Sequence, residues 1–274
     1  MQTKSKRGLT VLTECSIMIA LATVLSVIKL LDLPYGGSIT VASMLPIVII
    51  AQRHGTAIGL ASATAAAVLQ LLLGLNTLSY VTTWYSVVAV IFLDYVIAFA
   101  VFGLSGVFKN KISNQALSMF TGALFASILR YVCHVISGAT VWAGLSIPDS
   151  AALIYSVGYN ATYMIPESVV LLLAALYVGS SIDFTKRIPA PIAREKLNTG
   201  ATVLTLLTGF IALGALAADT ALVFSKLQSA DTGDFMISGL ADVNWTAVLI
   251  ITLAAAAVCA ALFFASRAVQ RKQR

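Results

Sequence analysis

The stretch TTWYSVVAVIFLDYVIAFAVFGLSGV, residues 82–107, decides the fold of this chain. One charged residue, Asp94, interrupts a run that is otherwise apolar or neutral. A transmembrane helix needs about 20 consecutive, mainly apolar residues, so this stretch can cross a bilayer. Asp94 lies near its middle, where a charge is costly and usually marks a binding site or an ion pathway. The stretch therefore predicts a membrane fold and a site within it.

The composition of the whole chain extends this prediction to all 274 residues. Hydrophobic residues make up 59% of the chain and charged residues only 10%, against about 45–50% and about 25% in soluble domains. So few charges cannot cover a soluble surface, which excludes a cytosolic enzyme, a secreted disulfide scaffold and a disordered regulator. We therefore expect an all-α fold, a polytopic membrane helical bundle.

Apolar runs separated by short polar breaks predict eight transmembrane helices. They are expected at residues 9–31, 38–52, 55–75, 82–107, 115–137, 152–181, 201–225 and 245–266. The basic, proline-containing stretch 184–200 predicts a cytoplasmic linker. It would separate a six-span substrate-binding domain, residues 1–183, from a two-span hairpin with a basic tail, residues 201–274.

The basic residues predict the orientation. Lys and Arg gather in cytoplasmic loops. With the N-terminus inside, only Lys29, Arg130 and Lys226 of the 17 Lys and Arg fall outside the inner segments. The opposite orientation would violate the rule at nearly every loop. We expect a multi-pass protein of the bacterial cell membrane with both termini in the cytoplasm, and no nucleic-acid partner.

Several motifs are missing from the sequence. It has no GxxxxGK[ST] loop for nucleotide phosphates, no HExxH and no GxSxG. Two histidines and three scattered cysteines leave little for a metal site. We therefore expect a protein that is not an enzyme and carries no cofactor. If it moves a solute uphill, the energy comes from an ion gradient or from a separate ATPase subunit.

Four ionisable residues are expected at membrane depth: Asp94, Arg130, His134 and Glu167. At a rise of about 1.5 Å per residue, they share the outer half of the bilayer, as a pocket open to the outside would. Arg130, His134 and Gly138 are four residues apart and line one helix stripe. Two carboxylates against one guanidinium leave one net negative charge if all are ionised, which favours a cationic, aromatic-ring ligand.

A structural interpretation of these groups stays open beside the functional one. Buried acid–Arg pairs can simply join helices, and aromatic residues near the outer boundary can form an interfacial belt. Glu14 and Lys29 lie nearer to span ends, where their side chains can reach water. The terminal hairpin shows no central charge and is expected to be a packing or stabilising element.

The runs Leu12–Ala20, Leu93–Gly106, Arg130–Trp142 and Tyr155–Asn160 resemble the thiamine-specific substrate-binding (S) component of energy-coupling factor transporters. The likeness covers about residues 9–183. The spacings His-x3-Gly-x3-Trp and Tyr-x4-Asn make it fairly specific. It implies a six-helix fold for this region and capture of thiamine from outside.

The resemblance also implies roles for single residues. Asp94 would contact the cation and ring of thiamine, and His134 and Trp142 would pack on or hydrogen-bond its rings. Asn160 would read the aminopyrimidine, with Tyr155 beside it. Tyr95, Arg130 and Gly138 would also line the pocket. Trp84 and Glu167 complete the expected site, because their expected depth in the membrane places them beside it.

The resemblance implies partners as well. Members of that family work with a transmembrane coupling (T) protein and two ATPase subunits, which fits the missing phosphate-binding loop. Ser16 and Ala20, four residues apart on the first helix, fill the places where small residues contact the coupling protein. Two positions depart from the family pattern: this chain has Asp94 where the family has Glu, and it has Arg130 where the family has Lys.

Two other classes of function stay open from the sequence. The first is a stand-alone secondary transporter of a cationic or heteroaromatic solute, with Asp94 and Glu167 as proton carriers. Interrupted spans in matching halves would favour it, but Pro166 has no counterpart. The second is an intramembrane enzyme with His134 as base, which ranks last because no nucleophile or metal set accompanies it.

Overall fold

The computed structural model describes residues 2–32, 37–142, 152–192, 199–227 and 236–271. They form two compact units, residues 1–192 and 193–274. Seven helices in the described ranges are long and apolar enough to cross a membrane, so the chain is a multi-pass membrane protein. The elements of the first unit are α1 (Gln2–Val27), β1 (Lys29–Asp32), β2 (Ser38–Thr40), α2 (Leu45–His54), α3 (Thr56–Leu73), η2 (Leu75–Tyr80), α4 (Trp84–Val90), η3 (Ile91–Ile97), α5 (Ala98–Ala100), η4 (Val101–Phe108), α6 (Gln115–Thr140), α7 (Ala152–Ser181), β3 (Ile182–Asp183) and β4 (Ala190–Pro191).

The second predicted span, residues 38–52, is wrong as a membrane-crossing helix. Its first residues form β2, which pairs antiparallel with β1. Helix α2 begins at Leu45, has Pro46 in its first turn and contains only ten residues, or about 15 Å. The apolar run arose for another reason: α2 is buried from Pro46 through Gln52, and a helix that is apolar all round is typical of a protein core.

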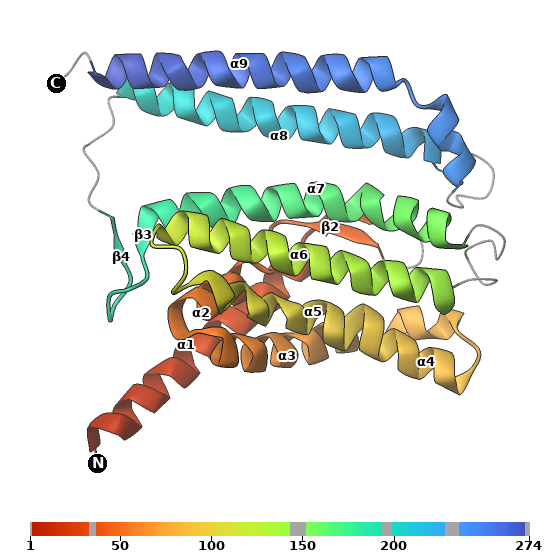
Figure 1. The fold of residues 1–274 in the computed structure, drawn as a ribbon, viewed down its shortest axis with the longest axis horizontal. Coiled ribbons are helices and arrows are strands. Elements are labelled where there is room, and N and C mark those ends of the chain that lie inside the picture. Colours follow the sequence, from red (N-terminus) through yellow and green to blue (C-terminus); the bar gives the residue numbers. More distant parts are fainter. Residues whose placement is uncertain (1, 33–36, 143–151, 193–198, 228–235, 272–274) are drawn as a thin grey trace. The chain divides into compact units, whose positions relative to one another are not determined.

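Helix α2 is central to the first unit. Its apolar side chains share one core with residues of α1, α3, η4, α6 and α7. Figure 1 shows α6 and α7 lying side by side, and these two helices pack closely along their length. Gly59 of α3 and Gly103 of η4 meet backbone to backbone, since a Cβ on Gly59 would lie 2.8 Å from the Gly103 carbonyl oxygen. Small residues permit such close approach between membrane helices.

The span that carries Asp94 is not a uniform α-helix. It runs as α-helix to Val90, as π-helix over η3, briefly as α-helix in α5 and as 3-10 helix over η4. A π-helical segment is rare and is frequently found at a functional site. The wider turn re-aims the Asp94 side chain relative to the straight helix that the sequence predicts.

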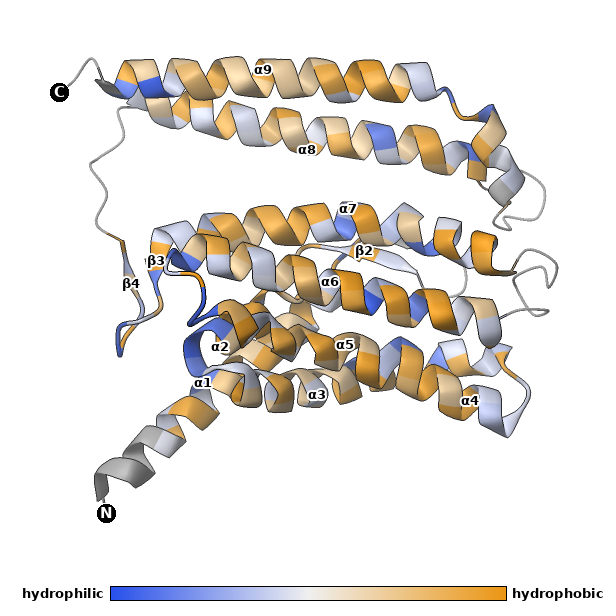
Figure 2. Ribbon diagram, in the orientation of Figure 1, coloured by the Kyte–Doolittle hydropathy of each residue, from blue (hydrophilic) through white to orange (hydrophobic). Residues whose placement is uncertain are grey.

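Polar residues gather at one end of the first unit, where Figure 2 shows hydrophilic colour at the α2–α3 turn and around β3. Arg53 donates to both carboxylate oxygens of Glu14, at 2.6 and 2.8 Å. It also donates to the carbonyls of Phe184, Lys186 and Arg187. Glu14 is therefore paired in the protein rather than free to extend into water. This contact ties α1, α2 and the β3–β4 hairpin together.

The second unit is a helical hairpin of α8 (Thr199–Leu227) and α9 (Trp245–Arg271), with the short 3-10 helix η6 (Ile237–Asp242) before α9. Among the described residues, polar contacts join the two long helices at Ser266 with Thr205 and the Ala201 carbonyl, at Cys259 with the Thr208 carbonyl, and at Thr252 with Asp219. Sequence reasoning missed Asp219, whose Oδ1 is buried without a hydrogen-bond partner among the described residues. Many outward residues of both helices are large and apolar, such as Phe210, Leu253 and Phe264, which suits contact with lipid.

Gly103→Ala should destabilise the first unit by about 1–3 kcal/mol, because the added methyl group overlaps the Leu60 backbone. The matched control is Gly209→Ala in α8, where a Cβ meets nothing within 4 Å. That change should be neutral or stabilise by about 0.5–1 kcal/mol through lower chain entropy. Thermal unfolding of both variants in detergent measures the difference. Equal behaviour of the two would contradict the close glycine contact.

Candidate functional site

Asp94 forms the centre of a polar cluster inside the first unit. Its Oδ1 lies 2.9 Å from His134 Nδ1. Its Oδ2 accepts from the Ser137 hydroxyl at 2.6 Å and from the Trp142 indole N–H at 3.2 Å. The three donors come from the last turns of α6 and the residues just after it, while Asp94 comes from η3. The Asp94 carboxyl group is thus satisfied by hydrogen bonds despite its low exposure to water.

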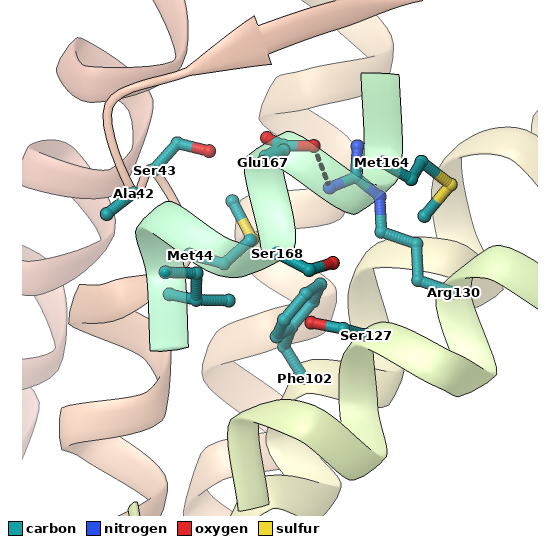
Figure 3. Close-up of a pocket in the computed structure, with 10 residues that line it drawn as sticks. Ala42, Ser43, Met44, Phe102, Ser127, Arg130, Met164, Glu167 and Ser168 are labelled. Carbon is teal, nitrogen blue, oxygen red and sulfur yellow. Dashed lines mark hydrogen bonds and ion pairs between the residues drawn. The ribbon is translucent and has the colours of Figure 1, made fainter. Parts of the chain in front are cut away.

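Arg130 continues this cluster one helical turn before His134. Its Nε donates to His134 Nε2 at 3.4 Å, and one terminal nitrogen donates to Glu167 Oε2 at 3.0 Å, the pair drawn in Figure 3. Its guanidinium carbon lies 4.6 Å from the centre of the Phe99 ring. The hydroxyl of Thr40, in β2, donates to the other oxygen of Glu167 at 2.8 Å. The groups form one line from Trp142 to Thr40 across four elements.

Asn160 of α7 joins the same cluster from a second side. Its amide nitrogen donates to the His134 carbonyl at 3.3 Å and to the Ser156 carbonyl at 2.9 Å. Its amide oxygen accepts from the Tyr163 hydroxyl at 2.7 Å. The Tyr163 ring meets His134 edge-on, with centroids 6.5 Å apart. These contacts hold the amide in one orientation beside the imidazole.

The structure thus brings most of the expected site residues together. Asp94, Arg130, His134, Trp142, Asn160 and Glu167 form one contact network, and Gly138 and Tyr155 are buried on the helices that carry it. Sequence reasoning missed Ser137 and Thr40 as hydrogen-bond partners. Ser137 lies three residues after His134, so helical spacing could have indicated it. Thr40 lies 127 residues before Glu167, and no local signal connects the two.

Two expected residues lie apart from the cluster. Trp84 begins α4, leaves 78% of its surface exposed and meets Tyr85 edge-on. It precedes Asp94 by ten residues, or about 15 Å along a helix. Tyr95 turns toward the end of α3, where its hydroxyl donates to the Gly74 carbonyl at 3.0 Å. Neighbouring residues on a helix point in different directions, so Tyr95 does not share the facing of Asp94.

A small cavity adjoins the cluster between the β2–α2 turn, η4, α6 and α7, as Figure 3 shows. Arg130, Glu167 and Ser127 provide polar atoms, and Phe102 and Leu171 provide apolar surface. Its free volume of about 10 Å³ has room for about one water molecule. A ligand larger than a water molecule would therefore not fit in this cavity as it stands.

The two small residues expected at a partner interface lie on α1. Ser16 and Ala20 are exposed, and the Ser16 hydroxyl donates back to the Leu12 carbonyl at 2.9 Å. Leu12 and Ile17 beside them leave 63% and 61% of their surfaces exposed. Among the described residues of the first unit, this face of α1 is therefore mainly apolar and exposed.

The family described as "Thiamine transporter protein" matches residues 12–185. The chain belongs to this family. It is 33% identical over 170 residues to thiamine transporter ThiT of Bacillus subtilis (strain 168), a match that covers 58% of this chain and 84% of the relative. The resemblance that the motifs indicate is thereby confirmed.

The solved structure of ThiT from Listeria monocytogenes gives a fold comparison. It matches with a TM-score of 0.53 and 23% identity, over 63% of this chain and 94% of the ThiT chain. The shared fold confirms the all-α membrane bundle. The family match ends at residue 185, before α8 and α9 begin. The hairpin is therefore an addition to the region shared with the thiamine transporter family.

Breaking the Arg130–Glu167 pair should destabilise the protein more than removing it. Arg130→Met or Glu167→Leu alone leaves a buried charge unpaired, at a cost of about 3–5 kcal/mol. The double variant should lose clearly less than the sum of the two. The control is the exposed Lys186–Asp183 pair, whose coupling should be far smaller because water screens it. Double-mutant cycles of thermal or denaturant unfolding measure both couplings, and additivity at Arg130–Glu167 would contradict the pairing.

Proposed function

We propose that this member of the thiamine transporter family is the substrate-capture subunit of an ATP-driven vitamin importer and binds thiamine from outside the cell. The observation that carries the proposal is the Asp94 carboxylate, held at membrane depth by three donors and surrounded by aromatic rings and an amide. Thiamine unites a cationic thiazolium with an aminopyrimidine, and the cluster offers a group for each.

The charge of the cluster supports a cationic ligand. With Asp94, Glu167 and Arg130 ionised and His134 neutral, the cluster has two negative charges against one positive charge. The resulting single negative charge attracts a cation, and little water is present to screen it. Rings such as that of Trp142 add about 0.5–2 kcal/mol each when a cation lies over their faces.

The amide of Asn160 supports recognition of the second ring. An amide offers both a donor and an acceptor, which an aminopyrimidine edge matches with its own acceptor and donor. Tyr163 and Ser156 hold that amide in place. Binding exchanges some hydrogen bonds within the cluster for bonds to the ligand, so that buried polar groups stay paired.

The position of the cluster supports access from outside. Arg53, Lys109, Lys186 and Arg187 gather at the end of the unit where α2 and α6 meet the β3–β4 hairpin. Basic residues favour the cytoplasmic side. The Asp94 cluster lies toward the far end of α6, and hence toward the exterior in this orientation. Both termini would then be cytoplasmic.

We also propose the partners that the family resemblance implies, a transmembrane coupling protein and two ATPase subunits. The chain has no phosphate-binding loop, so energy from ATP has to come from another protein. The uncovered face of α1 with Ser16 and Ala20 offers a surface for close helix contact. Residues 1–183 would capture the vitamin. Residues 184–200 would connect this domain to the hairpin that starts at residue 201, and the hairpin would add packing surface.

One observation favours a second candidate, an ion-coupled secondary transporter. Asp94, His134, Arg130 and Glu167 form a continuous line of ionisable groups, which proton relays in transporters also use. Purified protein in liposomes separates the two candidates. The capture subunit alone should bind thiamine without accumulating it under a proton gradient, whereas sustained uptake without ATPases would favour the secondary transporter.

Asp94→Asn should weaken thiamine binding at least tenfold, or by about 1.4 kcal/mol or more, since it removes the charge that faces the cation. Asp94→Glu is the matched control, because it keeps the charge and should keep most of the affinity. Isothermal titration measures binding, and thermal unfolding measures stability in the same samples. An equal loss of binding and stability in Asp94→Asn would favour a structural pair instead.

Trp142→Phe should abolish most of the fluorescence change that thiamine causes, because Trp142 contacts Asp94 and the other tryptophans are Trp84 and Trp245. Trp84→Phe is the control and should keep the change, since Trp84 is exposed and lies apart from the cluster. Fluorescence titration of both variants with thiamine measures this change. Loss of the signal in Trp84→Phe with retention in Trp142→Phe would place the ligand elsewhere.

A further inference from the structure

We propose that Arg130 is a positioning residue that holds His134 in its neutral form, with the proton on Nδ1, so that Asp94 keeps its full negative charge for the ligand. The proposal rests on the proposed function for its consequence. Its structural part, the form of the His134 ring, stands on the contacts of the cluster alone.

The form of the ring follows from which groups can donate. An arginine N–H can only donate, so the Nε of Arg130, 3.4 Å from His134 Nε2, requires that this ring nitrogen accept. A nitrogen that accepts carries no proton. The remaining ring proton then lies on Nδ1, which donates to Asp94 Oδ1 at 2.9 Å. The imidazole is therefore neutral.

The guanidinium of Arg130 is held in place for this role. Glu167 accepts from its terminal nitrogen at 3.0 Å, and the Phe99 ring lies against its carbon at 4.6 Å. Thr40 donates to Glu167 from β2 and orients that carboxylate. Glu167 thus balances the charge of Arg130 and acts on the ligand only through it.

A protonated His134 would change the cluster. It would donate from both ring nitrogens, oppose the charge of Arg130 and neutralise Asp94. The titratable groups near the ring are Asp94 and Tyr163, with Arg130 and Glu167 beyond its other nitrogen. Tyr159 lies against Tyr163, and Cys133 and Tyr95 are within electrostatic reach of Asp94. Attraction of a cation would then be lost without any change in the shape of the site. Arg130 therefore sets selectivity for a charged ligand.

Nitrogen NMR of the purified chain with labelled histidine tests the ring directly. The chain has only two histidines, so His54→Gln leaves the signals of His134 alone. We expect a protonated nitrogen at Nδ1 and an unprotonated nitrogen at Nε2 in the protein without added ligand. In Arg130→Met the Nε2 signal should move toward the protonated value. A wild-type ring protonated at Nε2, or no shift of Nε2 in the variant, would overturn the proposal.

A ligand comparison tests the consequence. In Arg130→Met a protonated His134 would pair with Asp94, and the remaining negative charge would lie on Glu167, away from the ligand. Affinity should then fall at least tenfold for thiamine but much less for its uncharged aminopyrimidine precursor. Glu167→Gln keeps an acceptor for Arg130 and should keep the wild-type His134 signals. If Arg130→Met fails to fold, Arg130→Gln removes the charge but keeps a polar side chain that can accept as well as donate, and the Nε2 signal should move toward the protonated value there too. Normal NMR signals without thiamine binding would refute the proposed function and leave the ring assignment intact.

Discussion

The structure depends on one constraint, the need to satisfy a carboxyl group with hydrogen-bond partners in the interior of a membrane bundle. Asp94 meets it with donors from His134, Ser137 and Trp142, which all belong to the end of α6 or the residues after it. The π-helical segment aims the carboxylate at them. An unpaired charge at this depth would cost several kcal/mol, or about 3 kcal/mol even on the most permissive scale. The packing of η3 on α6 is therefore decided by hydrogen bonding as much as by apolar contact.

A second polar group secures the other end of the same unit. Arg53 uses its guanidinium on Glu14 and on three backbone carbonyls, and it thereby joins α1 to the segment that follows α7. Only a short segment connects the two polar groups. Ala42, two residues after Thr40 of the Asp94 cluster, has φ of 51°. Helix α2 follows and carries Arg53 in its last turn. Helix α2 is buried from Pro46 through Gln52 and packs in the core between the two polar groups.

The C-terminal hairpin also contains a carboxyl group, Asp219, but its hydrogen-bond partners are of a different kind. Its helices have no basic residue beside Asp219, and the carboxyl group is satisfied on one oxygen by Thr252. Hydroxyl and thiol groups of small residues make the remaining interhelical contacts. Side-chain hydrogen bonds between membrane helices are worth about 1 kcal/mol each. The hairpin therefore has a polar seam of its own, separate from the cluster of the first unit.

The sequence by itself determined the membrane class, most of the long helices and the group of residues that carries the site. Hydrophobicity and helical spacing are local properties, and they place Arg130, His134 and Asn160 on inward faces without knowledge of the neighbours. The short α2 was missed because an apolar run looks alike whether lipid or protein surrounds it. Only the tertiary structure decided which charges pair: Glu167 with Arg130 and Thr40, and Arg53 with Glu14. Those partners are separated by 37 to 127 residues in the chain, and their pairing depends on which helices become neighbours, a property of the packed bundle rather than of any single segment.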